Sequence, residues 1–591
     1  MAQIVSTSEK KIYQIKRWLG LNESPDGDTH MDMGEAAAMR NFRITRESHL
    51  QVRPGYGTVV TVSAGKRIRG LWSGYVGGAF HTVAACNGQL WDVDLEGGTA
   101  QSKGAIDDAD AFFFGFSEKL YILTGTGYYA WDGTGALAAV DGYVPIVSTA
   151  VPPAGGGTAL ESINLLTGKR RAQFSPDGSA KTFQLPETDL SEIVSVEGTE
   201  ISYTSDLTAG TVSFTSAPAK GVNTITITWR KGDGERGRVT AMRYAELFNG
   251  ASDSRVFLYG DGTNTALYSG LDENGTPSAE YFPAMNELAV DSENTPITAM
   301  LRHYDRLLIF KPDSAYSCAY DTMTLDTQAV AAAFYVAPLN RAVGNVAPGQ
   351  ARLVDNSART LFSRSVYQWS LASGAVRDER NAKRISDKVT DTLGRFGLEG
   401  CITFDDEWNH EYYIFCDGQA VVNNYGNDTW YYYTNLPVSA VTQVKGTLYF
   451  GTPDGAIMEF SRRYHNDNLE EIDAYWESGS MDFDMDWRRK YSAMLWIAIK
   501  PESQAMIHIT AQSNIKSSYP IKTISAGLST FLHANFAHWS FGTNRKPQLI
   551  RAKLKVKKAT YYKLILFSKS ASSTATVLSM DFQVRYTGNV K

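Results

Sequence analysis

The feature that most constrains the fold is a strand ending that the sequence repeats. The segments "NGQLWDVD" (87–94), "GYYAWDGTG" (127–135) and "SVYQWSLASG" (365–374) each close a short apolar run with an aromatic residue and then turn polar. Similar runs of about four to seven residues follow one another after Arg53, separated by Gly, Asn-Gly and Asp-Gly. Turns this short join antiparallel neighbours, so the sequence predicts an all-β protein.

Each of these small sheets is unable to bury a hydrophobic face alone. The units recur at irregular spacing, mostly about 40 to 55 residues, and stacking around an axis would bury their faces, with the aromatic residues wedged between neighbouring sheets. We expect a β-propeller of six to seven irregular blades, provisionally 59–97, 105–150, 238–292, 293–345, 346–394, 395–436 and 437–462. Stacked β-sandwiches remain the alternative, because they have the same alternating strands.

Changes in composition divide the chain further. A Pro/Gly-rich joint, "STAVPPAGGGTAL" (148–160), precedes about six short strands, the size of a small β-sandwich that would be inserted between two blades. Longer strands follow Glu471 and predict a second β-sandwich. The expected regions are an N-terminal arm or docking segment (1–58), a first propeller part (59–152), an inserted β-sandwich module (153–237), a second propeller part (238–466) and a C-terminal β-sandwich (467–591).

Charge and hydropathy exclude several classes of protein. The 591 residues include 57 basic and 63 acidic side chains, a net charge of −6, which excludes a bulk polycation that holds nucleic acid by charge. No stretch approaches the roughly 20 apolar residues of a membrane helix. The first 20 residues do not have the pattern of a secretory signal. We expect a protein made in the cytoplasm, without a membrane segment.

Helical signals are scarce, and the clearest is "GEAAAMRNF" (34–42), which predicts a helix with Ala37, Met39 and Phe42 on its buried side. Four cysteines do not make a disulfide framework. Cys401 and Cys416 flank a predicted hairpin that would place them opposite each other, and we expect a packed pair of thiols.

Catalytic motifs are missing from the sequence. It contains no nucleophile elbow, no phosphate-binding glycine loop and no His-Glu-x-x-His helix. His533 and His538 form the closest histidine pair, but their spacing suits neither a helix face nor a strand face. We therefore expect no enzyme, and no catalytic residue, cofactor or metal ligand.

An acidic segment, "SMDFDMDW" (480–487), would set Asp482, Asp484 and Asp486 on one side of a strand. Three carboxylates in this arrangement could bind a hard cation or serve as paired acids. The favoured interpretation is a solvated strand face, with the alternating side chains in the core: Phe483, Met485 and Trp487.

A basic segment, "RAKLKVKK" (551–558), projects Arg551, Lys553, Lys555 and Lys557 from one side of a strand. Such a stripe could protect an exposed sheet edge, contact an acidic subunit face or meet nucleic-acid phosphates. Edge protection or plain solvation is the favoured interpretation.

The N-terminal segment also alternates basic and apolar residues, including Lys11, Tyr13, Arg17 and Trp18. It could dock on a neighbouring ring, or it could be a first strand or helix that closes the propeller. The candidate subunit or partner contacts are therefore Lys11, Tyr13, Arg17, Trp18, Arg551, Lys553, Lys555 and Lys557.

Residues 20–56 resemble the opening of tail-associated propeller proteins of double-stranded DNA phages. The shared pattern is a Gly-Leu-Asn start, a Gly-Glu-Ala segment, an Asn-Phe pair and an Arg-Pro-Gly-Tyr turn, here at 20–22, 34–36, 41–42 and 53–56. Two later segments are also similar to that family, "LYSGLDENGTPSAEYFP" (267–283) and "EYYIFCDGQAVVNNYGNDTWYYYT" (411–434). The inserted module resembles a small β module of phage tail proteins.

The resemblance implies a structural virion protein of the bacteriophage tail, most like the nozzle or stopper ring below the portal. Such proteins form homo-oligomeric rings, often hexamers, around the channel through which the genome leaves during ejection. The implied partners are an adaptor or portal-side ring and tail fibre or tip proteins, while double-stranded DNA passes without sequence-specific binding. The implied location is the virion tail.

Two other functions remain open. Abundant Trp and Tyr, together with Asp405, Asp406 and Glu407, would suit a tail-tip propeller that binds or cleaves carbohydrate. A cellular propeller scaffold that binds peptides is the third possibility.

Overall fold

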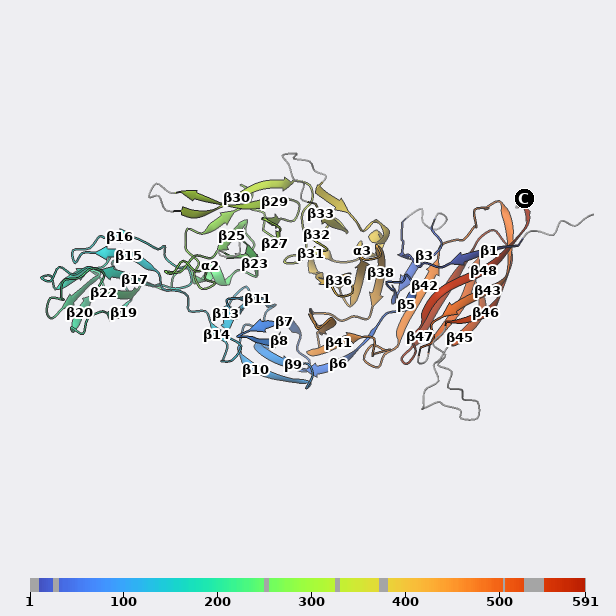
Figure 1. The fold of residues 1–591 in the computed structure, drawn as a ribbon, viewed down its shortest axis with the longest axis horizontal. Coiled ribbons are helices and arrows are strands. Elements are labelled where there is room, and N and C mark those ends of the chain that lie inside the picture. Colours follow the sequence, from blue (N-terminus) through green and yellow to red (C-terminus); the bar gives the residue numbers. More distant parts are fainter. Residues whose placement is uncertain are drawn as a thin grey trace, which may run out of the picture.

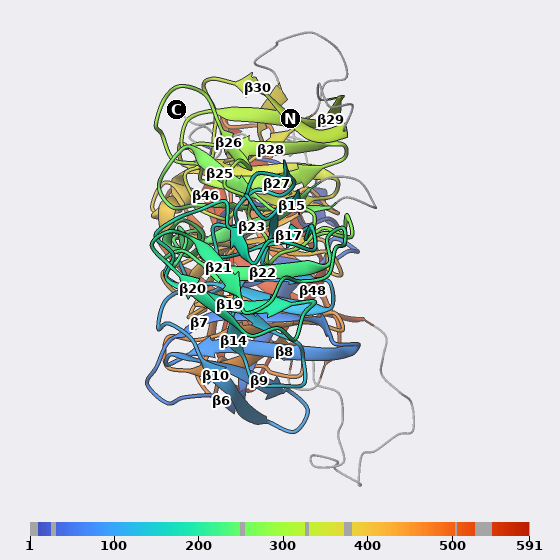
Figure 2. The ribbon, with the colours of Figure 1, turned by 90° about the vertical axis from the view of Figure 1, so that its left-hand side faces the viewer.

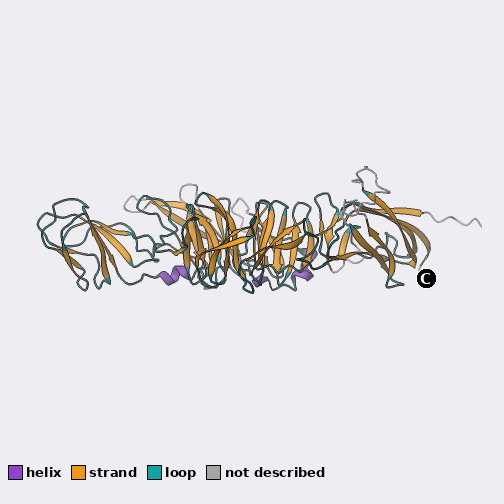
Figure 3. Ribbon diagram, turned by 90° about the horizontal axis from the view of Figure 1, so that it is seen from below, coloured by secondary structure: helices purple, strands orange, loops and turns teal. Residues whose placement is uncertain are grey.

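The computed structural model describes residues 10–24, 31–248, 254–324, 330–370, 381–502, 505–525 and 547–589. Within these ranges the protein is all-β, and three bodies lie in a row along its longest axis (Figures 1 and 3). We name them the inserted unit, the central body and the terminal unit. The described helices are single turns: α2 (Arg236–Thr240), η2 (Asp387–Val389), α3 (Thr390–Leu393) and η3 (Leu398–Gly400). None of the described helices is long and apolar enough to cross a membrane.

The central body contains, among the described residues, seven antiparallel sheets of four strands. The first sheet contains β7 (Ile68–Val76), β8 (Ala79–Cys86), β9 (Gln89–Asp94) and β10 (Thr99–Ala105). The second contains β11 (Phe112–Phe116), β12 (Lys119–Leu123), β13 (Tyr128–Trp131) and β14 (Ala138–Ala139). The third contains β23 (Tyr244–Phe248), β24 (Arg255–Tyr259), β25 (Thr265–Tyr268) and β26 (Glu287–Ala289).

The next three sheets have the same meander order. They are β27 (Ala299–His303), β28 (Arg306–Phe310), β29 (Ala315–Thr324) and β30 (Val330–Asn340); β31 (Arg352–Val354), β32 (Ser357–Phe362), β33 (Ser365–Trp369) and β34 (Ala382–Arg384); and β35 (Ile402–Asp406), β36 (Glu411–Cys416), β37 (Gln419–Asn424) and β38 (Thr429–Thr434).

The seventh sheet joins distant parts of the chain. It takes β39 (Ala440–Val444), β40 (Thr447–Gly451) and β41 (Ala456–Ser461) from the end of the central body, and its fourth strand is β6 (Gly55–Thr61) from the beginning. The first strands of successive sheets contact one another in the order β7, β11, β23, β27, β31, β35 and β39, and β39 contacts β7. The chain therefore returns to its start within the central body.

Aromatic strand endings lie between neighbouring sheets, as the repeated sequence pattern predicts. Trp131, which is 1 % exposed, shares a core cluster with Val76 and Leu90 of the preceding sheet and contacts the ring of His81 at 4.9 Å between centroids. Trp369 contacts Phe310 of the preceding sheet at 5.2 Å. Each indole thus buries a large apolar area between two sheets that could not be stable alone.

The inserted unit interrupts the central body after β14. Its five-stranded sheet contains β15 (Ile146–Val151), β16 (Thr158–Ala159), β17 (Lys169–Phe174), β19 (Glu192–Glu197) and β22 (Ile225–Arg230), and its three-stranded sheet contains β18 (Thr182–Gln184), β20 (Tyr203–Asp206) and β21 (Thr211–Phe214). One core cluster, with Phe174, Phe183 and Trp229, takes residues from both sheets. Figure 2 shows this unit end-on, in front of the central body.

The inserted unit begins earlier in the chain than the sequence predicts, with β15. Residues 146–151 were assigned to the first propeller part, but β15 pairs in parallel with β17 of the inserted unit. The Pro/Gly-rich joint (148–160) lies inside this unit, where it includes most of β15 and all of β16, and not at its boundary.

The terminal unit is built from both ends of the chain. One six-stranded sheet contains β1 (Lys10–Ile15), β4 (Phe42–Ile44), β5 (Leu50–Val52), β43 (Arg488–Ile499), β46 (Gln548–Ala559) and β48 (Thr576–Asn589). The other contains β2 (Gly20–Leu21), β3 (Glu35–Arg40), β42 (Ile472–Ser478), β44 (Met506–Ser513), β45 (Tyr519–Ser525) and β47 (Tyr562–Ser570). Residues 10–52, expected as a separate arm, contribute five of these described strands.

The helix predicted over 34–42 is wrong, because the structure places β3 there. β3 pairs in parallel with β2 and antiparallel with β42, which comes from the other end of the chain. Helix propensity is a weak preference, and pairing with two distant strands overrides it.

The acidic strand predicted over 480–487 is also wrong. Phe483 and Asp484 have positive φ values of 56° and 61°, and the Asp484 amide donates a hydrogen bond to Asp482 Oδ1 at 3.1 Å, so the segment turns. Phe483 is buried as expected, whereas Trp487 is 58 % exposed. The three carboxylates therefore do not share a strand face.

We predict that Trp18 is a major contributor to the stability of the terminal unit. Its side chain is 0 % exposed and contacts Trp476 edge-on at 4.9 Å. Trp18→Ala should lower the free energy of unfolding by about 3–5 kcal/mol, because it leaves a large cavity. Urea denaturation followed by tryptophan fluorescence and circular dichroism measures this loss.

The matched control is Trp487→Ala, which removes an exposed indole from the same unit. It should change the free energy of unfolding by less than about 1 kcal/mol. Equal effects of the two substitutions would contradict the assignment of Trp18 to the core.

Candidate assembly site at the joints between the three bodies

The joint between the central body and the terminal unit centres on one buried arginine. Arg53 lies in the short link between β5 and β6, and its side chain is 0 % exposed. It donates to Asp467 Oδ1 at 2.8 Å, Asp467 Oδ2 at 2.5 Å, Asn41 Oδ1 at 2.9 Å, Pro54 O at 2.9 Å and Thr434 O at 2.9 Å. A guanidinium has five N–H donors, so every donor of Arg53 is used.

Asn41 holds the other side of this joint. Its φ of 55° is in the left-handed region, which Asn tolerates better than most residues. Its Nδ2 donates to Thr434 Oγ1 at 2.8 Å and to Asp473 O at 2.9 Å, while its Oδ1 also accepts from the Thr434 amide at 2.9 Å. One side chain thus contacts the central body, the terminal unit and Arg53.

Glycine is required where Gly55 and Gly34 meet other backbone segments. A Cβ on Gly55 would lie 2.0 Å from the carbonyl oxygen of Asn466. A Cβ on Gly34 would lie 2.2 Å from Arg17 O, and its φ of +109° disfavours other residues.

Glu35 makes a second polar contact across the same joint. It is 6 % exposed, and it accepts from Lys388 Nζ of the central body at 2.8 Å and from Asn22 Nδ2 at 2.9 Å. Burial opposes ionisation, but these hydrogen bonds outweigh it, so the pKa of Glu35 lies below its ordinary value. The carboxylate is therefore charged when the joint is formed.

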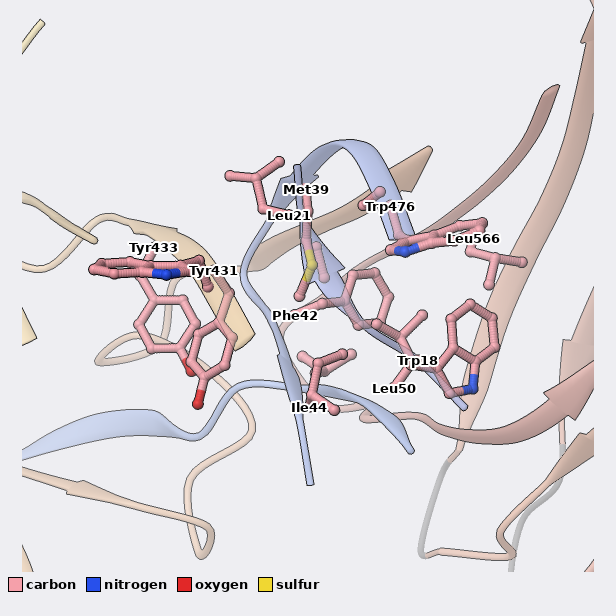
Figure 4. Packing of buried hydrophobic residues seen from close by; sticks show 14 of the residues in the cluster. Trp18, Leu21, Met39, Phe42, Ile44, Leu50, Tyr431, Tyr433, Trp476 and Leu566 are labelled. Carbon is pink, nitrogen blue, oxygen red and sulfur yellow. The ribbon is translucent and has the colours of Figure 1, made fainter. Parts of the chain in front are cut away.

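An apolar cluster fills the joint between these polar contacts. Figure 4 shows Phe42, Leu21 and Met39 between Tyr431 and Tyr433 of the central body and Trp18, Trp476 and Leu566 of the terminal unit. All of these residues are buried in one cluster that continues through both bodies.

The joint to the inserted unit has the same construction. Asn164 donates through Nδ2 to Tyr143 O at 2.8 Å and to Glu280 O at 2.9 Å, and its Oδ1 accepts from the Phe282 amide at 3.0 Å. Tyr281 Oη donates to Ser162 O at 2.8 Å. Residues 280–282 therefore bind the segment that leads into β17.

The predicted N-terminal contact residues divide between core and surface. Lys11 and Arg17 are exposed, but Trp18 is fully buried and Tyr13 packs at 4.7 Å against Phe483. Pairing of β1 with β48 places them in the terminal unit of the same chain. Trp18 is therefore not available to a partner, which corrects the prediction for this residue.

The basic stripe has the predicted alternation of burial. Arg551, Lys553, Lys555 and Lys557 are exposed, whereas Ala552, Leu554 and Val556 are buried. Within the described part of the chain, β46 is an edge strand that pairs with β43, and two register shifts interrupt that pairing. Lysines and bulges are both features that protect a sheet edge.

The two groups of candidate contact residues lie at opposite edges of one sheet. β1 and β46 are separated by β48 and β43, so the structure does not bring Lys11 and Arg17 together with the basic stripe.

The acidic residues of β35 do not form a facing pair. Asp405 and Asp406 are consecutive and project to opposite sides of the strand. Asp406 accepts from Asn409 Nδ2 and Gln443 Nε2, each at 2.7 Å, and so stabilises a turn. Burial raises the pKa of Asp405 to about 7, whereas Glu407 is exposed.

The cysteine prediction is confirmed. Pairing of Ile402 with Phe415 places Cys401 opposite Cys416, and both are buried free thiols. Within the described ranges, no group of three or more His, Cys, Asp or Glu side chains is placed to hold a metal ion. His533 and His538 lie outside the described residues.

The first strands of the central body surround a cavity of about 720 Å³. Two of its arginines are engaged within the chain: Arg69 pairs with Asp108 at 2.8 Å, and Arg352 donates to the backbone oxygens of Gly349, Ala351 and Thr403. The lining of the cavity is thus polar and charged.

No protein-family model matches the sequence, and no curated protein matches it. Solved structures with partial likeness include the computationally designed Ika8 protein (10 % identity, TM-score 0.32, covering 68 % of this chain and 99 % of that one). They also include the AfRom2 CNH domain (7 %, 0.34, 69 % and 99 %) and an exo-beta-1,3-galactanase from Phanerochaete chrysosporium with galactose (9 %, 0.18, 81 % and 96 %). These TM-scores are too low to carry an argument.

We predict that Arg53 cannot be replaced without destabilising the joint. Arg53→Ala removes the donor from the buried Asp467 carboxylate and from three further acceptors, and should cost about 3–5 kcal/mol of unfolding free energy. Arg53→Lys should recover only part of this loss, because an ammonium has three donors instead of five. Chemical denaturation measures both.

Arg463→Ala is the control for this experiment. Its side chain is 70 % exposed and pairs with Glu459 at 3.4 Å, so the loss should stay below about 1 kcal/mol. Full stability of Arg53→Lys would contradict the role given to the five hydrogen bonds.

We predict that the contribution of Glu35 depends on pH. Because the pKa of Glu35 is lowered on folding, its stabilisation is present above the ordinary value of 4.5 and is lost as the pH falls through the folded-state pKa. Glu35→Gln should therefore lose about 1–3 kcal/mol at pH 7 and progressively less in acid. Denaturation curves between pH 3 and pH 7 (roughly) measure the difference.

Glu96→Gln is the matched control, because the Glu96 side chain is 87 % exposed and contacts an exposed lysine. A loss at Glu35 that stays constant across this pH range would show that packing, and not charge, explains it.

Proposed function

We propose that the chain is a structural virion protein of a bacteriophage tail, and that its central body is a seven-bladed β-propeller. In this proposal β6 completes the last blade, and the inserted and terminal units are two β-sandwiches. The protein would form a nozzle or hub ring that lines or extends the DNA exit channel and docks other tail proteins.

One observation carries the proposal: the segments that resemble phage tail proteins are the segments that build the two joints. Asn41, Arg53 and Gly55 from residues 20–56 lie in the joint to the terminal unit. Tyr281 and Phe282 from residues 267–283 lie in the joint to the inserted unit. A resemblance of chance composition would not be expected to gather at the contacts between bodies.

This construction suits a subunit of a ring under mechanical load. Polar side chains with all donors used, packed around a continuous apolar cluster, hold three bodies in one orientation. Large rigid subunits with fixed faces can close a cyclic assembly, because closure demands a constant angle between neighbours. The mild negative net charge suits a wall that DNA must pass without being held.

The proposed function predicts assembly into a ring and presence in virions. The full chain should be imaged by electron microscopy and weighed by mass photometry, alone and with the adaptor or portal-side ring of the same phage. We expect the chain to form closed rings, either alone or on that partner. We also expect each purified particle to contain as many copies of the protein as one ring has subunits.

Arg53→Lys gives the matched variant, because it alters the joint without touching the outer surface. It should reduce incorporation into particles more than Arg463→Ala does. A chain that remains monomeric with its partner and is missing from purified virions would overturn the proposal. Specific binding to host polysaccharide would instead favour the tail-tip carbohydrate function.

A further inference from the structure

A cleft of about 720 Å³ opens beside the joint between the central body and the terminal unit. We call it the junction cleft. Residues from seven separate parts of the chain line it, including Arg43, Arg46, Gln51, Trp408, Arg462 and Lys500. This volume is within the range of sites that bind small molecules.

Positive charge dominates the lining of the cleft. Arg43, Arg46, Arg462 and Lys500 are permanent cations, and Glu47 is the acidic side chain among the lining residues. Arg46, Arg462 and Lys500 have no ion-pair partner in the described part of the chain. Burial, together with the nearby charge of Arg43, lowers the pKa of Arg462, which indicates that these two cations repel each other.

Arg43 is a buried cation whose side chain has no hydrogen-bond acceptor among the residues that the structure describes. The residue is 8 % exposed, and its Nε is buried with no hydrogen-bond partner. Glu411 Oε1 lies 3.8 Å from Nη1, which is too long for a hydrogen bond, and that carboxylate already accepts from Tyr413 Oη and Tyr431 Oη. Nε is closed off from solvent, but the side chain keeps 10 % of its exposure, so an oxyanion in the cleft would meet the terminal nitrogens of the guanidinium.

The number of acceptor atoms favours a phosphate over a carboxylate. Four cations less Glu47, Glu411 and Glu502, whose charge also acts on Arg462, leave a charge of +1, so the cleft favours an anion. A phosphate monoester brings three terminal oxygens to the cations, whereas a carboxylate brings two. Gln51 Oε1 is also buried without a donor, while Gln51 Nε2 donates to Thr576 Oγ1 at 2.9 Å. The cleft thus offers an acceptor for a ligand hydroxyl or amino group beside the cations.

Trp408 supplies an aromatic surface at the same cleft. Its side chain is 75 % exposed, although the turn after β39 lies against its ring. A Cβ on Gly446 would lie 3.0 Å from three atoms of the indole, which places that glycine over one ring face and leaves the other face open. Such a supported ring suits stacking with a nucleobase.

We propose that the junction cleft binds a nucleotide unit, with its phosphate on Arg43 and the neighbouring cations and its base against Trp408. This inference is independent of the proposed function. The same chemistry occurs in a free nucleotide and in a nucleotide of a single strand, and the experiment distinguishes the two.

The test titrates the full chain with four probes and follows heat of binding and tryptophan fluorescence, in which the difference between the wild-type chain and Trp408→Ala gives the share of Trp408 among the 12 tryptophans. The probes are adenosine 5′-monophosphate, inorganic phosphate, adenosine and a short single-stranded oligothymidylate. We expect adenosine 5′-monophosphate to bind more tightly than phosphate or adenosine, and its affinity to fall with added salt. Tighter binding of the oligothymidylate than of the mononucleotide would identify a single strand as the source.

Variants assign the binding to the cleft. Arg43→Met should weaken nucleotide binding about tenfold or more, because it removes charged hydrogen bonds. The double variant Arg46→Gln with Lys500→Gln changes exposed residues that do not take part in the core, so it tests the cations even if Arg43→Met fails to fold. Trp408→Ala should weaken binding of the mononucleotide but not of inorganic phosphate.

Lys553→Gln is the control, because it removes an exposed cation from β46, away from the cleft. The affinity of the Lys553→Gln variant for the nucleotide should equal that of the wild-type chain. Any one of three results would overturn the proposal. The first is no binding of any probe, and the second is equal binding by the cleft variants and the wild-type chain. The third is binding of inorganic phosphate alone, without any effect of Trp408→Ala.

Discussion

The pairing of Arg53 with Asp467 is the constraint on which the arrangement of the molecule depends. β5 ends at Val52 in the terminal unit and β6 begins at Gly55 in the central body, so two residues connect strands of different bodies. Arg53 occupies that link and bonds Asp467, which lies between β41 and β42 where the chain crosses back. Both crossings between the two bodies are therefore tied to each other at one point.

The second joint follows the same physical rule with different groups. Asn164 accepts and donates there as Asn41 does at the first joint, and in both places a single amide connects backbone groups of two bodies. Hydrogen bonds to backbone atoms have strict geometry, whereas apolar contacts tolerate sliding. Such joints set an orientation, while the cluster around Trp18 and Trp476 supplies the larger part of the stability.

The sequence predicted the elements that local patterns determine. Alternation over 551–557 predicted both the strand and its exposed side, and the repeated aromatic endings predicted side chains wedged between sheets. The prediction failed where distant pairing decides: residues 35–40 have helical composition but lie between β2 and β42. For the same reason the sequence leaves Trp18 between a docking contact and a first strand or helix of the propeller, since nothing near it in sequence indicates contact with Trp476.

The site residues were harder to predict than the strands. Arg53 and Asn41 belong to quoted motifs, but their partners Asp467 and Thr434 are hundreds of residues away, so the sequence contained no sign of their roles. The junction cleft is the extreme case, because Arg43, Trp408, Arg462 and Lys500 come from separate strands and turns and form no local pattern.

Two buried arginines ten positions apart therefore have opposite functions. Arg53 uses all five donors within the chain, so replacing it disturbs the joint and nothing is left for a ligand. Arg43 has an ion pair with Glu411 at 3.8 Å, and its side chain makes no hydrogen bond to the described residues, although it is buried nearly as deeply. A buried ion pair contributes orientation more reliably than stability, whereas an unsatisfied buried cation is stable only when the surrounding fold holds it in place. Arg53 thus holds the central body and the terminal unit together, and the contact between these two bodies creates the cleft around Arg43.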